Sequence, residues 1–301
     1  MSAHSGSDLR ILAPGLPGLA EPLDPQALAA RHPLWAADVE ALGPWRLEQG
    51  QGGQVWLPEA LQDADVAVCG PCASTMDVAR ELVQRGGLGF FGSVIAPAQT
   101  LGRGQLRRAW LSAPGNVLAT LVCPPAQGLW NDLRPLVLGH LLAEALEGVC
   151  PGVRVKWPND LLLDDRKIGG ILVEERAEGI LAGVGLNLAW APAEQDLRGG
   201  HGVAAGAIAP AGGGPGPLGL WLRLVNHLET GYMTLLETFS PSEFLRIFQT
   251  RLAWMGRNVH VQEGANVQYA AKISGVSGKG GLLLDRDGKE MLLLAGDVTP
   301  L

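Results

Sequence analysis

The chain has 301 residues, of which 47% are hydrophobic and 18% charged, and its formal net charge is −7. The apolar fraction can fill a substantial core, which excludes a mainly disordered chain. The acidic balance argues against duplex DNA or an anionic bilayer as a partner, although a local pocket can still bind phosphate.

No apolar run reaches the roughly 18–20 residues of a membrane-spanning helix. The best candidate, residues 179–193, is shorter and contains Asn187. The first ten residues lack the basic start and apolar stretch of a secretory signal. Four cysteines in a chain of this length do not make a disulfide scaffold. We therefore expect a soluble, cytoplasmic protein.

Residues 1–60 are rich in Pro, Gly and Ala, and predict two short helical stretches at most. They contain no pair of basic helices, so a DNA-reading helix-turn-helix is not expected. A strand is predicted over 65–70, followed by a helix over 76–85. Ser74 and Asp77 have the spacing of a capping box at the start of that helix.

The central part of the chain alternates between strand and helix patterns. Two helices are predicted after the first one, over 133–147 and around 221–235, and a third over 241–252. Strands are predicted over 92–96, 117–123, 153–157, 169–174 and 179–188.

After Gly256 the pattern changes to short alternating runs separated by turn clusters, which predicts a small all-β module, a compact barrel. The predicted fold class is therefore α+β with a mixed sheet. The predicted domains are an N-terminal extension of unknown role (1–60), a central domain (61–255) and a C-terminal β domain (256–301).

Residues 156–175 combine a stiff polar turn with a lysine beside two glycines. Pro158 stiffens the turn, and the two residues after it can bond the backbone or a ligand. Lys167 stands just ahead of Gly169 and Gly170, where the lack of side chains lets another molecule approach the backbone. On residue types alone, a β-hairpin with a polar turn and a solvated lysine is the favoured interpretation.

Residues 99–110 place three arginines, Arg103, Arg107 and Arg108, within six positions of an otherwise acidic chain. Guanidinium groups and the backbone N–H groups around glycines suit a carboxylate or a phosphate. Trp110 follows, and an indole can stack on a purine. The alternative is a solvated basic loop.

Cys69 and Cys72 enclose Gly-Pro between a predicted strand and a predicted helix, the position of a thioredoxin-like redox motif. Val68 stands where the Trp of that family would be, and the later elements do not fit a thioredoxin domain of roughly 100 residues. Cys123 and Cys150 are single, which disfavours a structural zinc site. A redox role is the weaker interpretation.

Taken together, these segments resemble the biotin protein ligase family, the biotin–[acetyl-CoA-carboxylase] ligases, from about Val66 to the C-terminus. Residues 156–174 match the family block K-W-P-N-D…D-R-K-x-x-G-I-L-x-E almost throughout. The resemblance implies a mixed-sheet, class II synthetase-like catalytic domain over 61–255 and an SH3-like barrel over 256–301. It also implies that the DNA-binding domain of the bifunctional members is absent.

The chemistry implied by the resemblance is ligation through a C–N bond. Biotin is activated by ATP as biotinyl-5′-AMP, and is then transferred to a lysine of the biotin carboxyl carrier protein domain of acetyl-CoA carboxylase. Mg²⁺ accompanies ATP, and no protein residue is firmly assigned to the metal. A homodimer is possible within the family, and neither DNA nor a membrane is an expected partner.

The resemblance assigns site residues position by position. The implied catalytic residues are Lys167, Arg103, Arg108 and Asp160. The implied biotin-binding residues are Ser74, Thr75, Gln99, Gly102, Arg103, Gly104, Lys167, Gly169, Gly170, Gly183 and Gly185. The implied nucleotide-binding residues are Arg103, Arg108, Trp110, Asn159, Lys167 and Asn187.

The chain departs from the family pattern at Gln105, where a second Arg is usual, at Arg107, where Gly is common, and at Met76, where Asn is frequent. Loss of the charge at position 105 is expected to weaken retention of the adenylate. Two other functions remain open: a lipoate or octanoyl ligase of the same fold, and a non-catalytic biotin-binding protein. The complete K-W-P-N-D block and the predicted barrel favour biotin ligation.

Overall fold

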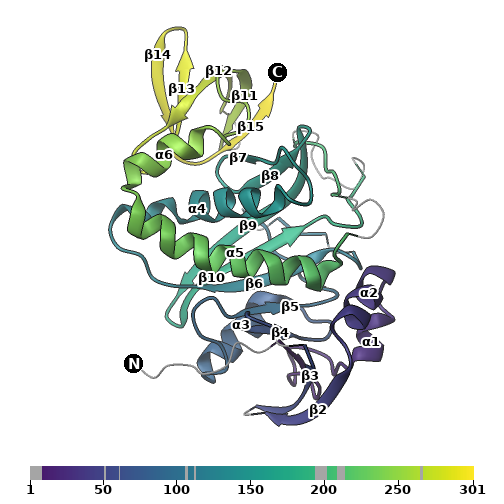
Figure 1. Ribbon diagram of the computed structural model, residues 1–301. Coiled ribbons are helices and arrows are strands. Elements are labelled where there is room, and N and C mark those ends of the chain that lie inside the picture. The colour runs from purple at the N-terminus through teal and green to yellow at the C-terminus, as the bar shows by residue number, and fades with distance from the viewer. Residues whose placement is uncertain are drawn as a thin grey trace. The chain divides into compact units, whose positions relative to one another are not determined.

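The structure is a computed structural model that describes residues 9–301 apart from 51, 61, 106–107, 112, 194–201, 209–213 and 265–266. Figure 1 shows its ribbon. The chain divides into two compact units. The first comprises Met1–Pro125, Gly169–Ala191 and Ala207–Glu229, and the second Ala126–Ile168, Pro192–Gly206 and Thr230–Leu301.

The first unit is built on a mixed sheet with the strand order β2-β3-β1-β4-β5-β6-β10-β9. The strands are β1 (Arg10–Leu12), β2 (Trp45–Gly50), β3 (Gly53–Pro58), β4 (Val66–Val68), β5 (Ser93–Ile95), β6 (Val117–Cys123), β9 (Arg166–Arg176) and β10 (Gly179–Leu186). β4 pairs in parallel with β1 and β5, and the other pairs are antiparallel. Every residue of β4, β5 and β6 is buried, which explains why they are continuous apolar runs.

The helices of the first unit are α1 (Pro25–Ala29), α2 (Pro33–Leu42), α3 (Thr75–Gln84) and the beginning of α5 (Pro217–Thr238). α3 packs on β5, β6 and β10. Buried Asp38 on α2 accepts hydrogen bonds from the N–H groups of Gly216 (3.0 Å) and Leu218 (2.8 Å) at the start of α5. Burial raises the pKa of Asp38, against the lowering effect of these bonds.

The second unit contains α4 (Leu129–Leu146), the hairpin of β7 (Arg154–Lys156) and β8 (Asp160–Leu163), and α6 (Pro241–Gln249). The rings of Trp130 and His140 on α4 pack against Phe244 on α6. The C-terminal strands are β11 (Asn258–Glu263), β12 (Val267–Val276), β13 (Leu282–Arg286), β14 (Lys289–Leu293) and β15 (Asp297–Pro300). They pair antiparallel in the order β14-β13-β12-β11-β15, drawn in yellow and yellow-green in Figure 1.

The predicted fold class is confirmed: a mixed sheet with helices, and a small C-terminal β domain. The strands of residues 10–58 were not predicted, because they are interrupted by Gly and Pro, and β2 has no buried residue to produce an alternating pattern. The helix predicted over 133–147 begins earlier, at Leu129, and contains Pro135. The bounds of the three predicted domains stay a prediction. Across the described ranges, no helix is both long and apolar enough to cross a bilayer.

Candidate active site

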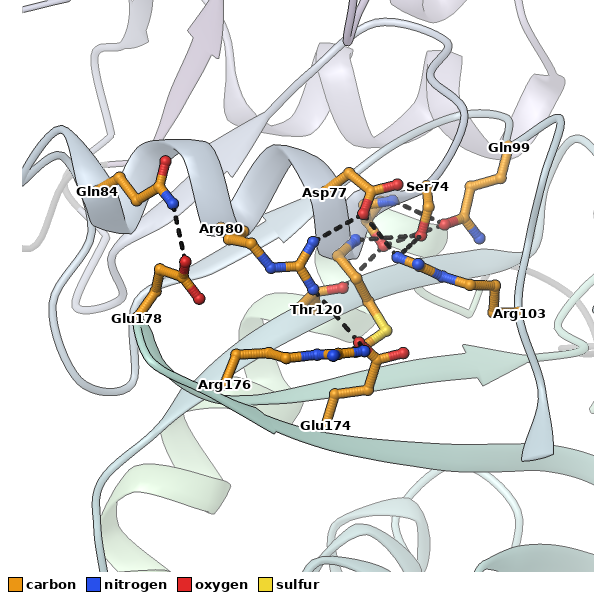
Figure 2. Close-up of polar contacts among 12 residues, drawn as sticks. Ser74, Asp77, Arg80, Gln84, Gln99, Arg103, Thr120, Glu174, Arg176 and Glu178 are labelled. Carbon is orange, nitrogen blue, oxygen red and sulfur yellow. Dashed lines mark hydrogen bonds and ion pairs between the residues drawn. The ribbon is translucent and has the colours of Figure 1, made fainter. Parts of the chain in front are cut away.

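Three of the predicted biotin-binding residues, Ser74, Thr75 and Gln99, lie together at the start of α3. Figure 2 labels Ser74 and Gln99 there. Gln99 Oε1 accepts from the backbone N–H of Thr75 (2.8 Å) and from its hydroxyl (3.2 Å). The Thr75 hydroxyl also lies 2.8 Å from that of Thr120 on β6. Ser74 caps the helix by accepting from the N–H of Met76 (3.3 Å). Two adjacent hydroxyls and an amide are thus held at the first turn of a helix that packs on the sheet.

The segment Gln99–Trp110 folds back on itself around the predicted arginines. The N–H of Trp110 donates to the carbonyl of Gly102 (2.9 Å), and that of Gly104 donates to the carbonyl of Arg108 (2.8 Å). Arg103 and Arg108 are exposed, and Arg103 reaches α3, where it pairs with Asp77. Arg107 lies outside the described residues. The predicted cation-bearing loop therefore presents Arg103 and Arg108 at the surface.

A strip of backbone without side chains lies beside this loop, on β9 and β10. Gly185 pairs with Gly170, and Gly183 pairs with Thr120 on the other neighbouring strand. A Cβ at Gly185 would lie 2.4 Å from the Trp110 ring. The indole therefore rests directly on the β10 backbone at a position that only glycine permits.

The remaining predicted residues of the first unit flank this strip. Gly169 pairs with Leu186, the last residue of β10. Asn187 follows and is buried, and its carbonyl accepts from the N–H of Ile208 (2.8 Å). The glycines and Asn187 thus line the same strand ends as Trp110.

The second unit holds the other predicted residues, Asn159, Asp160 and Lys167. Asn159 is buried in the β7–β8 turn. Lys167 Nζ lies 2.6 Å from Asp160 Oδ1, so Lys167 is ion-paired as well as partly exposed. The predicted hairpin with a polar turn is present, but its lysine is held by a carboxylate.

A second ammonium binds the same carboxylate. Lys156, whose side chain is 7% exposed, lies 3.3 Å from Asp160 Oδ2 and 2.5 Å from Asp297 Oδ1. Burial alone would raise the pKa of Asp160, but the charges and hydrogen bonds of Lys167 and Lys156 outweigh it and lower that pKa. Burial likewise opposes the charge of Lys156, and the two carboxylates raise its pKa above the ordinary value. Asp160 and Lys156 therefore both stay charged at neutral pH.

Sequence reasoning missed Thr120, Lys156 and Asp297 as partners in these clusters. Thr120 carries a weak signal, a hydroxyl within the apolar run Val117–Cys123. Lys156 belongs to the recognised block and is a charged residue at the end of a buried strand. Asp297 has no signal, because its partner lies 141 residues away.

The cysteines do not support the redox interpretation. All four are free and buried. A hydrogen bond with Cys72, together with burial, raises the pKa of the Cys69 thiol well above its usual range. Burial raises the pKa of Cys150 to about 11. Such thiols are protonated at neutral pH and react poorly as nucleophiles.

The metal-ligating side chains of the described residues are dispersed. Among the residues whose positions are described, no three His, Cys, Asp or Glu side chains cluster closely enough to hold an ion. Both oxygens of Asp160 already face ammonium groups. Asp160 is therefore engaged with ammonium groups and is not assigned as a ligand of Mg²⁺.

Comparison with known proteins adds independent information. The family model for the biotin/lipoate A/B protein ligase family matches residues 73–189. A biotin–[acetyl-CoA-carboxylase] ligase of Paracoccus denitrificans is 28% identical over 224 residues, covering 68% of this chain and 88% of that protein. The bifunctional ligase/repressor BirA of Escherichia coli is 30% identical over 213 residues, covering 68% and 65%.

Solved structures share the fold. The biotin protein ligase from Aquifex aeolicus, in complex with biotin and ATP, aligns with a TM-score of 0.64 and 23% identity, over 78% of this chain and 97% of that one. A biotin protein ligase from Leishmania major, in complex with biotin, aligns with a TM-score of 0.55 over 77% and 98%. The mixed sheet with a small β domain is thus the biotin protein ligase fold. Residues 73–189 thus match the biotin/lipoate A/B protein ligase family, and the wider chain is similar to a biotin–[acetyl-CoA-carboxylase] ligase.

Proposed function

We propose that this chain is an ATP-dependent biotin protein ligase. A carboxylate oxygen of biotin attacks the α-phosphorus of ATP, pyrophosphate leaves, and biotinyl-5′-AMP forms. The ε-amine of a carrier lysine then attacks the acyl carbon, an amide forms and AMP leaves. The names of two relatives support acetyl-CoA carboxylase as the acceptor, and within it the biotin carboxyl carrier protein domain is the proposed carrier.

The observation that carries the proposal is the ammonium of Lys167, held 2.6 Å from Asp160 within the block that most resembles the family. Two anions must meet in the first step, and a positive charge beside them offsets their repulsion and stabilises the charge on the phosphoryl oxygens. Asp160 orients this ammonium, and Lys156 keeps Asp160 ionised. In this proposal Asp160 is a positioning residue, and it does not serve as a metal ligand.

The residues of the first unit supply binding groups. The hydroxyls of Ser74 and Thr75 and the amide of Gln99 suit the polar ring of biotin, and the glycines of β9 and β10 let a ligand lie against the backbone. Arg103 and Arg108 suit carboxylate and phosphate. Trp110 offers an aromatic surface for adenine.

Mg²⁺ takes part in this proposal only as a companion of ATP, whose phosphates and water provide its usual oxygen ligands. No step depends on a protein residue bound to the metal. A homodimer, a cytoplasmic location and the absence of DNA binding stay predictions.

The function is tested with purified protein, biotin, ATP and Mg²⁺. Mass spectrometry should detect biotinyl-adenylate, and a biotin carboxyl carrier domain should become labelled at its lysine. Lipoate in place of biotin serves as the comparison, because the matching family model also includes lipoate ligases. Labelling by lipoate but not by biotin would reassign the substrate, and biotin binding without pyrophosphate release would indicate a non-catalytic protein.

A further inference from the structure

Asp77, on the first turn of α3, is outside every set of residues assigned so far. Its place at the helix start predicted a capping box with Ser74, but the structure shows a different use. Ser74 caps the N–H of Met76, and the Asp77 carboxylate faces two arginines (Figure 2). Helix capping therefore does not account for the direction of this side chain.

One oxygen of Asp77 joins the loop Gln99–Trp110 to the helix. Oδ1 accepts from Arg103 Nη2 at 2.7 Å and from Arg80 Nη1 at 2.9 Å. Arg80 Nη2 continues to Glu174 Oε2 on β9 at 3.3 Å, and Arg176 approaches the same oxygen at 3.5 Å. Asp77 is thus held by Arg80 of its own helix, and Arg80 is held in turn by Glu174 of the sheet. The same Asp77 oxygen also binds the loop.

The way in which Asp77 holds Arg103 leaves most of the guanidinium available. Both hydrogen bonds of Arg103, to Asp77 and to Ser74 Oγ (3.4 Å), use Nη2. Within the described part of the chain, Nη1 and Nε of Arg103 make no hydrogen bond. A guanidinium can bind an anion through its remaining nitrogens while one nitrogen stays on the carboxylate. The cluster around it contains three arginines and two carboxylates, so its formal charge is positive and suits an anion.

We propose that Asp77 is a positioning residue that holds Arg103 on α3, with two guanidinium nitrogens directed to an anionic group of the substrate. The reaction to which this applies rests on the proposed function. The contact itself exists without any ligand and can be tested alone. Asp77 and Arg103 are 32% and 38% exposed, so water weakens their ion pair and the effect of losing it is modest.

The ligand-free test is tryptic cleavage of the full chain within the loop. In Asp77→Asn, cleavage after Arg107 and Arg108 should be about two- to fivefold faster, the range that an exposed ion pair supports. The matched control is Glu81→Gln, which removes an ion pair of the same helix, with Arg85 at 2.5 Å, that does not involve the loop. Its cleavage rate should equal that of the unchanged protein.

Arg103→Gln tests the same contact from the other side and covers the case in which the Asp77 variant fails to fold. It should accelerate cleavage at the two later arginines by the same factor. Adding Asp77→Asn to Arg103→Gln should then have no further effect. Equal rates in the single variants and the unchanged protein would overturn the proposal, as would an Asp77 effect that persists without Arg103.

The link to catalysis is measured separately as adenylate formation. Asp77→Asn should raise the KM of biotin or ATP about two- to fivefold, with kcat little changed, because a binding group is less well placed. A lower KM would overturn the proposal, because Asp77 would then compete with the substrate for Arg103. Absence of all ligase activity in the unchanged protein would refute the proposed function, and the cleavage results would still decide the role of Asp77.

Discussion

Substitution of Gly185 by Ala is expected to displace the Trp110 indole from the sheet. The added Cβ would lie 2.4, 2.6 and 2.7 Å from three atoms of that ring. Carbon atoms in contact are about 3.5–4.0 Å apart, so the closest pair overlaps by about 1 Å. β10 is paired on both sides and the indole is rigid, so the whole ring must move.

The cost of such overpacking is about 1–3 kcal/mol. If the ring stays in place, the cost is measured as a lower free energy of unfolding in urea. If the ring moves away, stability is largely kept and the cost is measured as weaker binding of a non-hydrolysable ATP analogue in calorimetry. We expect the second outcome, because Trp110 lies in a partly exposed loop.

The matched control is Gly183→Ala, two residues away on the same strand. Its Cβ would lie 3.1 Å from Met76 Sδ, and a flexible thioether can shift by a few tenths of an ångström at little cost. Neither glycine has a left-handed φ, so backbone strain does not distinguish them. The reasoning is refuted if the two variants have the same unfolding free energy and the same nucleotide affinity.

Three further predictions concern the second unit and the cysteines. Lys167→Ala should slow adenylate formation about 10²–10³-fold in single-turnover kinetics, the usual cost of removing one electrostatic group from a transition state, and an unchanged rate would exclude Lys167 from catalysis. Asp160→Asn should lower the free energy of unfolding at pH 7 by about 1–3 kcal/mol, because buried Lys156 loses one of its two carboxylate partners and keeps only Asp297. The folded-state pKa of Asp160 is lowered, so its contribution to the free energy of unfolding is complete above about pH 4, the ordinary carboxyl value. That contribution is lost as the pH falls through the lowered pKa. Urea titrations between pH 7 and 3 should therefore show a smaller pH-dependent decrease in unfolding free energy in Asp160→Asn than in the unchanged protein. Cys150, with a pKa of about 11, should be alkylated slowly at pH 8, and Cys72→Ser should retain ligase activity; loss of activity would restore the redox interpretation.

Much of the secondary structure could be predicted from the sequence, because strand and helix patterns depend on neighbours a few positions away. The start of α3 at Ser74 is one example, since a short polar side chain before an apolar stripe caps a helix locally. The block at residues 156–174 also indicated a family resemblance, because the match to the family block depends only on the order of consecutive residues. The N-terminal strands β1–β3 could not be predicted in this way, since β1 gains its pairing from β3 and from the distant β4.

The partners of the functional side chains were decided by the tertiary structure. The sequence determined that Lys167 stands before two glycines, but the carboxylate that holds its ammonium became evident only from the pairing of Asp160. It determined that Gly185 lies in a strand, but the reason for a glycine there is an indole that arrives from another segment. Local sequence patterns indicate which secondary structure a segment forms and which of its faces is buried. Charged groups and aromatic rings from distant positions come into contact only when the chain has folded. The distances between them then determine which interactions they make.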